Sequence, residues 1–239
     1  MGECNGGKKG GGGGGGSDSV TSVIGQGGVQ IDLTATPLVY GKLDPSISPA
    51  ERRALEAQED KRRNAAVEYA YAVQADGSPA TDIYGNPLKE KRGGKGSCAV
   101  PYRMWVQDGT LTHNHPRTGD ETGMLGGTFS TADIDGFASR GLRTMRAAAA
   151  EGTYSISKGK NFNSSGLRKY RLEIERTANS AARQKVLDAG ERYKRGEISR
   201  TQLMKAATEA TNAALVQIHN GLIAGQQQYG YVYTLERRA

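Results

Sequence analysis

Cysteine and long apolar runs are scarce in this sequence, and each shortage excludes a class of protein. The 239 residues include two cysteines, Cys4 and Cys98, which are too few for a disulfide framework and favour a reducing, cytoplasmic compartment. No apolar run approaches the roughly 18 residues that a membrane-spanning helix needs, and the first residues lack the apolar segment of a secretory signal. We therefore expect no membrane partner.

Large apolar side chains are also rare at the start of the chain. Residues 1–30 include the glycine run Gly10–Gly16 and cannot bury enough surface to offset the entropy lost on ordering, so their composition predicts a disordered tail. Residues 31–64 are expected to form an N-terminal extension and a helix. Ser48 is followed by proline and, three residues on, by glutamate, which is typical of a capping box opening a helix to about Arg63. We expect this charged helix to pack against the edge of the following domain or to lead into it.

Histidine is the third scarce residue type. The sequence contains three, and two of them, His113 and His115, are two positions apart in Thr-His-Asn-His-Pro. In an extended strand residues i and i+2 point to the same face, so the two imidazoles would lie side by side. Ser130 stands at an expected helix start, and Asp133, one turn later, can add a carboxylate at the same end of the helix. Two imidazoles, a carboxylate and an open position for water form the ligand set of a catalytic zinc site.

Glu68 is the candidate proton acceptor. It lies in an alternating apolar run, Val67–Val73, upstream of the histidines. A carboxylate that is near a zinc-bound water without binding the ion can take the water's proton and later pass it to a leaving amine. With this residue, the ligand set becomes a candidate hydrolytic site.

Together, the glutamate, His-x-His-Pro and Ser-x-x-Asp resemble the JAMM motif of the JAB/MPN zinc metallopeptidase superfamily. His-Asn-His-Pro in particular is similar to its RadC-like bacterial and phage branch. The likeness covers residues 68–154, about a third of the chain. It implies that the two histidines and Asp133 bind Zn²⁺. It also implies that Glu68 is the general base and acid, and that Ser130 donates a hydrogen bond to the tetrahedral intermediate.

The resemblance further implies an α+β fold, an α/β sandwich in which a mixed sheet is flanked by helices, as in MPN and cytidine-deaminase-like domains. Residues 65–158 would form this metal-binding domain. The spacing of the motif departs from the usual pattern, because fourteen residues, Pro116–Phe129, separate the second histidine from Ser130, about twice the usual number. Four glycines allow this stretch to be looped out without moving the ligands. The insertion therefore bears on the substrate class more than on zinc binding.

The rest of the sheet is predicted from alternating apolar positions and turn residues. Asp76–Gly77 is typical of a hairpin turn, and Glu151–Gly152 of a tight turn between two strands. A helix is expected from Thr131 to Arg140, and Trp105, the only tryptophan, is expected in the core. The predicted strands are residues 66–74, 81–84, 97–100, 109–113, 143–149 and 153–156.

The last third of the chain has a helical apolar period. Two apolar stripes, ending at Gly196 and Gly225, predict two long antiparallel helices within residues 159–228, followed by a last sheet strand in residues 229–239. This helical hairpin would be an insertion between two strands, suited to bind a protein partner or a second copy of the chain. His219 lies beside the second stripe and is expected away from the metal.

The net charge of the chain is +7, and the basic excess is concentrated in the helical hairpin. Residues 168–200 contain ten Lys or Arg against five Asp or Glu. A solvated helix face and a contact with nucleic acid or another polyanion are both consistent with this pattern. Only two tyrosines there could stack on bases, so charge alone does not define a nucleic-acid enzyme.

These patterns predict a zinc-dependent JAMM-type metallopeptidase or isopeptidase-like hydrolase, in which Glu68 activates a zinc-bound water and the substrate is a protein or peptide. Two alternatives stay open. His-Asn-His and the basic charge also suggest an HNH-like nuclease or nucleic-acid-processing module, although such a site needs a third, downstream histidine. The likeness to MPN-like domains of phage head-associated proteins suggests a non-catalytic virion or assembly protein, which would be virion-associated rather than cytoplasmic.

Overall fold

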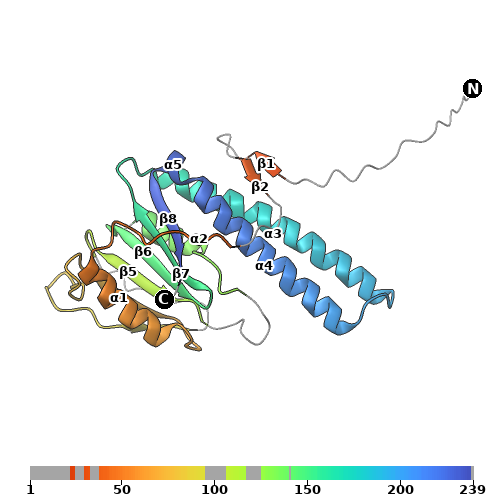
Figure 1. The fold of residues 1–239 in the computed structure, drawn as a ribbon, viewed down its shortest axis with the longest axis horizontal. Helices are drawn as coiled ribbons and strands as arrows, with labels where there is room; N and C mark the ends of the chain where they lie inside the picture. Colours follow the sequence, from red (N-terminus) through yellow and green to blue (C-terminus); the bar gives the residue numbers. More distant parts are fainter. Residues whose placement is uncertain are drawn as a thin grey trace, which may run out of the picture.

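The computed structural model describes residues 22–24, 30–32, 38–94, 106–116, 125–139 and 141–237. Its centre is a mixed sheet with helices on both faces, so the described chain has an α+β fold (Figure 1). The strands are β3 Tyr69–Val73, β4 Lys91–Arg92, β5 Thr110–Asn114, β6 Thr144–Ala149, β7 Gly152–Lys158 and β8 Tyr231–Glu236. Their order is β4-β3-β5-β6-β7-β8, and β5 and β6 are parallel whereas the other neighbours are antiparallel.

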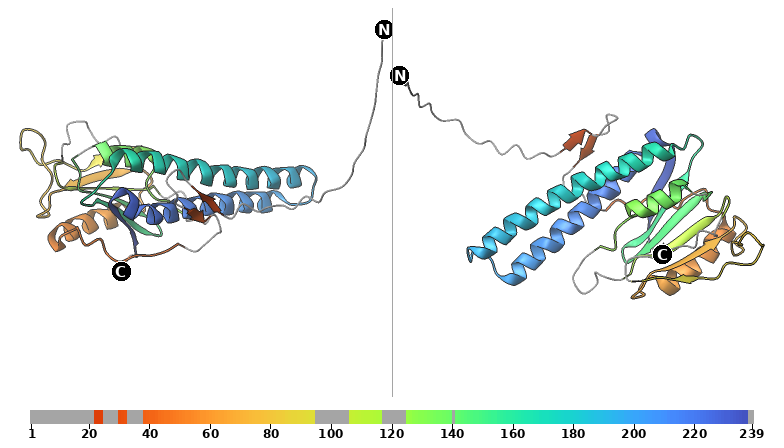
Figure 2. Two further views of the ribbon diagram at one scale, coloured as in Figure 1. Left: turned by 90° about the horizontal axis from the view of Figure 1, so that it is seen from above. Right: turned by 180° about the vertical axis from the view of Figure 1, so that it is seen from behind.

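The helices divide between the two faces of the sheet (Figures 1 and 2). One face is covered by α1 (Pro49–Arg62), and the other by α2 (Thr131–Ser139), α3 (Ser164–Lys194) and α4 (Arg200–Ala224). The pair α3 and α4 forms an antiparallel hairpin whose distal end projects beyond the sheet, and the short α5 (Gln226–Tyr229) leads from it into β8. The hairpin thus connects β7 to β8, which are neighbours in the sheet. Among the described residues, no helix combines the length and apolar content needed to cross a membrane.

Two of the helices begin at capping boxes. The Ser48 hydroxyl accepts the Glu51 N–H at 3.2 Å, and the Glu51 carboxylate accepts the Ser48 N–H at 3.3 Å, which confirms the predicted start of α1. Ser199 and Gln202 form the same reciprocal pair at the start of α4. Because each box satisfies N–H groups that have no partner within the helix, both starts are fixed by local sequence.

The face of the sheet beneath α2, α3 and α4 carries the main apolar core. Alternation along β5 directs Leu111 and His113 to this face and Thr110 and Thr112 to α1. Each large apolar side chain buried here contributes about 2 kcal/mol through removal of its surface from water. The largest of them are Phe129, Ile134, Phe137, Tyr154, Ile156, Leu167, Tyr170, Ile174, Leu222 and Leu235.

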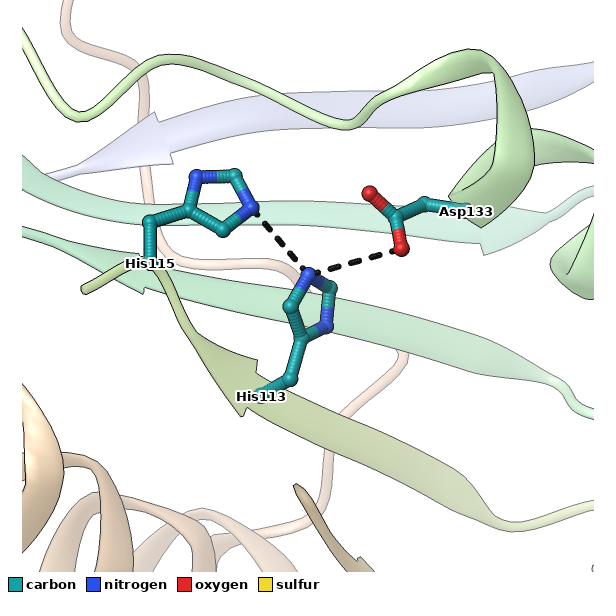
Figure 3. Close-up of side chains that lie close together, drawn as sticks. All are labelled: His113, His115 and Asp133. Atoms are coloured by element: carbon teal, nitrogen blue, oxygen red, sulfur yellow. Dashed lines mark hydrogen bonds and ion pairs between the residues drawn. The ribbon is translucent and has the colours of Figure 1, made fainter. Parts of the chain in front are cut away.

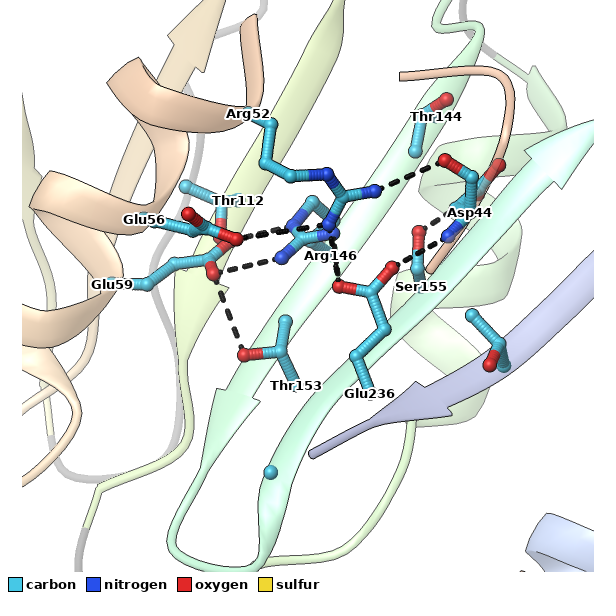
Figure 4. Close-up of polar contacts among 12 residues, drawn as sticks. Asp44, Arg52, Glu56, Glu59, Thr112, Thr144, Arg146, Thr153, Ser155 and Glu236 are labelled. Carbon is cyan, nitrogen blue, oxygen red and sulfur yellow. Dashed lines mark hydrogen bonds and ion pairs between the residues drawn. The ribbon is translucent and has the colours of Figure 1, made fainter. Parts of the chain in front are cut away.

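A polar layer fills the opposite interface, between α1 and the sheet (Figure 4). Glu51, Leu55 and Glu59 follow one another at intervals of one helical turn and are the buried residues of α1. The Glu59 carboxylate accepts hydrogen bonds from the Arg146 guanidinium at 2.7 and 3.0 Å and from the Thr112 hydroxyl at 2.9 Å. The prediction that α1 lies at the domain's edge is therefore wrong, because its carboxylates find donors at alternate positions of the central strands.

The connection that follows β3 also differs from the prediction. The predicted turn at Asp76–Gly77 is present, and the chain returns beside the end of β3, where the Ala80 N–H bonds to the Ala72 carbonyl at 2.9 Å. Residues 81–84 do not form the predicted returning strand, and the strands that pair with β3 are β4 and β5. The returning segment makes two isolated bridges, Val73 with Pro79 and Thr81 with Pro87. The Asp82 carboxylate accepts the N–H groups of two following residues, so a local turn competes with strand pairing.

The structure describes a short pair of strands where the predicted disordered tail meets the following segment. The strands β1 (Ser22–Ile24) and β2 (Gln30–Asp32) form an antiparallel pair, and β2 lies against α4. The rest of residues 1–30 lies outside the described residues. The same holds for Cys98, Trp105 and the predicted strand at residues 97–100.

Candidate metal centre

The three predicted ligands meet at the end of β5 (Figure 3). The Nε2 atoms of His113 and His115 are 3.2 Å apart, and Asp133 Oδ1 is 3.6 Å from His113 Nε2. The ligand atoms of all three residues lie within 4.8 Å of one another. In a tetrahedral zinc site with bonds of about 2.0–2.1 Å, neighbouring ligand atoms are about 3.3 Å apart. The two measured distances fit an ion of this size.

The strand backbone accounts for the pairing of the two imidazoles. His113 lies inside β5, and the main-chain N–H of His115 still bonds to the Ala148 carbonyl at 2.9 Å, one step beyond the β5–β6 ladder. The extended conformation therefore continues to His115, and residues two apart keep the same face. The sequence-based expectation for these two side chains is met in the described chain.

The ring of His115 is oriented by two carbonyl groups. Its Nδ1 atom is 3.0 Å from the Gly126 oxygen and 2.8 Å from the Gly127 oxygen. Carbonyl oxygens only accept hydrogen bonds, so Nδ1 carries a hydrogen, and Nε2 is the nitrogen that faces His113. Metal-binding histidines are commonly held in this way by an acceptor on the far side of the ring.

His113 is held neutral by its surroundings. Burial lowers its pKa to about 4, and the neighbouring His115 acts in the same direction, while the Asp133 carboxylate acts against it. The ring also hydrogen-bonds the main chain of Arg146. With His113 uncharged at pH 7, a cation is the partner that both Nε2 atoms and the carboxylate can share.

Asp133 is positioned by the start of α2. Its Oδ2 atom accepts the Ser130 N–H at 2.8 Å and the Ser130 hydroxyl at 2.7 Å, while its own N–H bonds to Ser130 Oγ at 3.1 Å. Burial would raise its pKa, but His113 and the hydrogen bonds from Ser130 hold the pKa of this carboxyl below its usual value. Ser130 thus directs Oδ1 toward His113.

Glu68 lies directly before β3 and is buried. Ala70 is the register partner of His113, and Glu68 is two residues before Ala70, so strand alternation predicts that its side chain points to the same face of the sheet. Its main chain is paired on the other side, because its N–H bonds to the Gly94 carbonyl and its carbonyl accepts the Gly93 N–H, both at 2.8 Å. Within the described residues the ligand cluster consists of the other three side chains and does not include Glu68.

The described end of the glycine-rich insertion is packed into the molecule rather than looped out. We call residues 125–129 the support loop. Its N–H groups at 126 and 127 bond to the Glu151 carboxylate, and the N–H of residue 125 bonds to Asn212 in α4 at 2.9 Å. Thr128 shares a 2.8 Å hydrogen bond with Tyr233, and the Phe129 carbonyl accepts from Arg171 in α3. Sequence reasoning missed these partners, for which the adjacent glycines were the only local sign of a close main-chain contact.

His219 is separate from this cluster. It is buried against β8, where its Nδ1 and the Tyr233 hydroxyl are 2.9 Å apart and its Nε2 is 2.9 Å from the Val39 carbonyl oxygen. Burial lowers its pKa, although the hydrogen bond to Val39 opposes this effect. Both ring nitrogens are engaged in the fold, so this histidine has a structural role.

The arrangement brings together two nitrogen ligands and one oxygen ligand that could hold a metal ion, with His113 buried and His115 and Asp133 half-buried. No protein-family model matches the chain, and no curated protein or solved structure matches it significantly.

Proposed function

We propose that this chain is a zinc-dependent hydrolase of the JAMM type that cleaves an amide or isopeptide bond in a protein or peptide substrate. The observation that carries the proposal is the convergence of His113, His115 and Asp133 at one point of the sheet. Three protein ligands leave a fourth position for water, which is typical of catalytic rather than structural zinc sites. A carboxylate on the same face, Glu68, adds the proton acceptor that hydrolysis needs.

The donor set fits zinc better than a harder ion. Two imidazole nitrogens and one carboxylate oxygen suit Zn²⁺, whereas Mg²⁺ and Ca²⁺ are bound mainly by oxygen. When bound, zinc supplies a Lewis acid and lowers the pKa of a water molecule toward 7. Histidine binds a metal only as the neutral imidazole, and His113, with its pKa near 4, is neutral at physiological pH.

Glu68 is assigned the proton transfers. In this mechanism its carboxylate accepts a proton from the attacking water and then donates that proton to the nitrogen of the leaving amine. Its place two residues before Ala70, the register partner of His113, supports the assignment, because strand alternation would direct the side chain to the face that carries the histidines. Substitution by glutamine would remove the proton acceptor while keeping the size of the side chain.

Ser130 is assigned two roles. Its contacts support the first, the orientation of Asp133 through the hydroxyl and the main-chain N–H. The second, donation to the substrate oxyanion, follows from the motif and requires the hydroxyl to rotate away from Asp133, because it has one hydrogen. An oxyanion donor of this kind typically contributes about 3 kcal/mol to stabilisation of the transition state.

The HNH-like nuclease has less support because it needs a third histidine. The chain contains three in all, and His219 is bound by Tyr233 and Val39. A non-catalytic assembly protein would use the same ligands but would not need Glu68 as a proton acceptor. It also predicts that replacing Glu68 changes no hydrolytic activity.

Metal analysis combined with a peptidase assay tests the proposal. Purified wild-type protein should contain one zinc per chain, His113→Ala should contain none, and Glu68→Gln should retain zinc but lose peptide hydrolysis. His219→Gln is the matched control, because it replaces a buried histidine outside the cluster and should keep the metal. Wild-type protein without zinc, or hydrolysis that persists in Glu68→Gln, would contradict the proposal. DNA cleavage that survives Glu68→Gln would favour the nuclease.

A further inference from the structure

Glu151 is connected to the metal centre through the support loop. It lies in the turn between β6 and β7, and its carboxylate accepts the N–H groups of Gly126 and Gly127, each at 3.0 Å. The carbonyl groups of the same two glycines accept the Nδ1 hydrogen of His115 at 3.0 and 2.8 Å. The peptide group between the glycines therefore bonds to Glu151 at its nitrogen and to His115 at its oxygen.

The backbone of the two glycines is adapted to this arrangement. Gly127 has a φ of +81°, a conformation that other residues rarely adopt. A Cβ atom at Gly126 would lie 2.8 Å from the Ala149 Cβ and 3.4 Å from Glu151 Oε2. Both positions exclude larger residues, so the two peptide groups can approach the carboxylate and the imidazole at the same time.

The carboxylate of Glu151 is itself fixed from the other side. The Tyr154 hydroxyl donates to Glu151 Oε1 at 2.7 Å, and Tyr154 is 1% exposed in the core. The second oxygen of the Glu151 carboxylate, Oε2, accepts the Gly126 N–H. A charged acceptor also strengthens these bonds and polarises the peptide group toward His115.

We propose that Glu151 is a positioning residue of the metal centre. Its carboxylate fixes the peptide groups of Gly126 and Gly127, and their carbonyls hold His115 with Nε2 directed at the ion. Without this anchor the support loop loses its fixed position and His115 can turn on its side-chain bonds. The inference rests on metal binding at the proposed site, but it does not depend on the bond that is hydrolysed.

Zinc affinity of the metal-free protein, measured against a chromogenic chelator, is the direct test. Glu151→Gln keeps the shape of the side chain but places an amide donor against one of the two glycine N–H groups. We expect zinc to bind about 10–100-fold more weakly, the usual effect of losing a residue that orients a ligand. In the cobalt-substituted protein the visible absorption bands should also shift, because they report the geometry of the bound ligands.

Glu236→Gln is the matched control. Glu236 is likewise buried, and it accepts the Asp44 N–H and bonds to Arg146, but it faces α1 on the opposite side of the sheet. This variant should be less stable, yet its zinc affinity should stay within about twofold of wild type, because Glu236 hydrogen-bonds neither the three ligands nor the support loop. An equal loss of affinity in both variants would mean that Glu151 acts only through general stability.

Other outcomes would contradict the proposed role of Glu151. Folded Glu151→Gln that binds zinc as tightly as wild type, with an unchanged cobalt spectrum, would overturn it. If this variant does not fold, Tyr154→Phe removes one anchor of the carboxylate and should weaken zinc binding in the same direction, and unchanged affinity there would overturn the inference. Wild-type protein that binds no zinc would instead overturn the proposed function and this inference together.

Discussion

Arg146 and Glu59 form a two-point ion pair in which both side chains are 1% exposed. The same guanidinium bonds to Glu236 at 2.9 Å, so one arginine joins α1, β6 and β8 beneath the helix (Figure 4). Burial alone would lower the pKa of Arg146, but the two carboxylates outweigh it and raise that pKa. The polar layer thus depends on charges that are mutually compensated.

We predict that Arg146→Met destabilises the protein by about 3–5 kcal/mol, because Glu59 and Glu236 would remain buried without their cation. Urea unfolding followed by circular dichroism measures the change. Arg168→Met is the control, since Arg168 pairs with Asp135 at the surface, and its loss should cost less than about 1 kcal/mol. Equal losses of stability in the two variants would show that the buried ion pairs contribute no more to stability than a surface pair.

The stability of the metal-free protein should depend on the state of His113. Its folded-state pKa is about 4, below the ordinary value of 6.5, so between these values the unfolded chain binds a proton that the folded chain does not. The free energy of unfolding should therefore fall as the pH falls, by about 2 kcal/mol from pH 7 to pH 5 for this group. His219, whose pKa is also lowered, adds to the slope in the same sense.

Denaturant unfolding at the two pH values, with a chelator present, tests this dependence. His113→Asn should lose part of the slope, and the remainder should be reduced further in the double variant with His219→Gln. A slope unchanged by His113→Asn would show that folding does not lower the pKa of this imidazole.

Gly127→Ala should weaken zinc binding as well as stability. The substitution forces a side chain into a backbone with φ +81° and places its Cβ 3.0 Å from the Leu215 side chain, next to the carbonyl that holds His115. Gly85→Ala is a close control, because Gly85 has the same φ but nothing within 4 Å of the added atom. Both should lose about 1–2 kcal/mol of stability, and only the first should lose zinc affinity. Equal zinc affinities would argue against a role for the support loop.

Ser130→Ala should affect both α2 and the metal. It removes the hydroxyl that accepts the Asp133 N–H and donates to Asp133 Oδ2, at a cost of about 1 kcal/mol in stability. Ser199→Ala removes an equivalent cap at the far end of the helical hairpin. Isothermal titration with zinc should detect weaker binding in the first variant alone. Unchanged binding would restrict Ser130 to capping the helix.

Local sequence patterns predicted the features that neighbouring residues determine. The capping box at Ser48, the alternation along β5 and the two apolar stripes of the helical hairpin each depend on contacts within a few residues. The same reasoning brought His113 and His115 together, because a strand fixes their relative direction. Their meeting with Asp133 depends on the tertiary fold, which the sequence suggested only through a motif.

The polar layer could not be predicted in this way. Arg146 and Thr112 occupy alternate strand positions, a pattern that normally indicates a face exposed to water. Their partner Glu59 lies 87 residues from Arg146, in a helix whose charge suggested a solvated position. Glu151 was missed for a related reason, since its bonds reach main-chain groups 24 and 25 residues away that carry no side-chain signal.

The helical hairpin also holds the support loop in place. Arg171 in α3 and Asn212 in α4 hold this loop from the two helices of the hairpin. A minimal version of this chain could have a hairpin with fewer distal turns, but it would have to retain the helical segments that carry Arg171 and Asn212. The same holds if the His-x-His motif is transplanted onto another scaffold. The geometry of the ligands therefore depends on the helical hairpin, and the two would have to be transferred together.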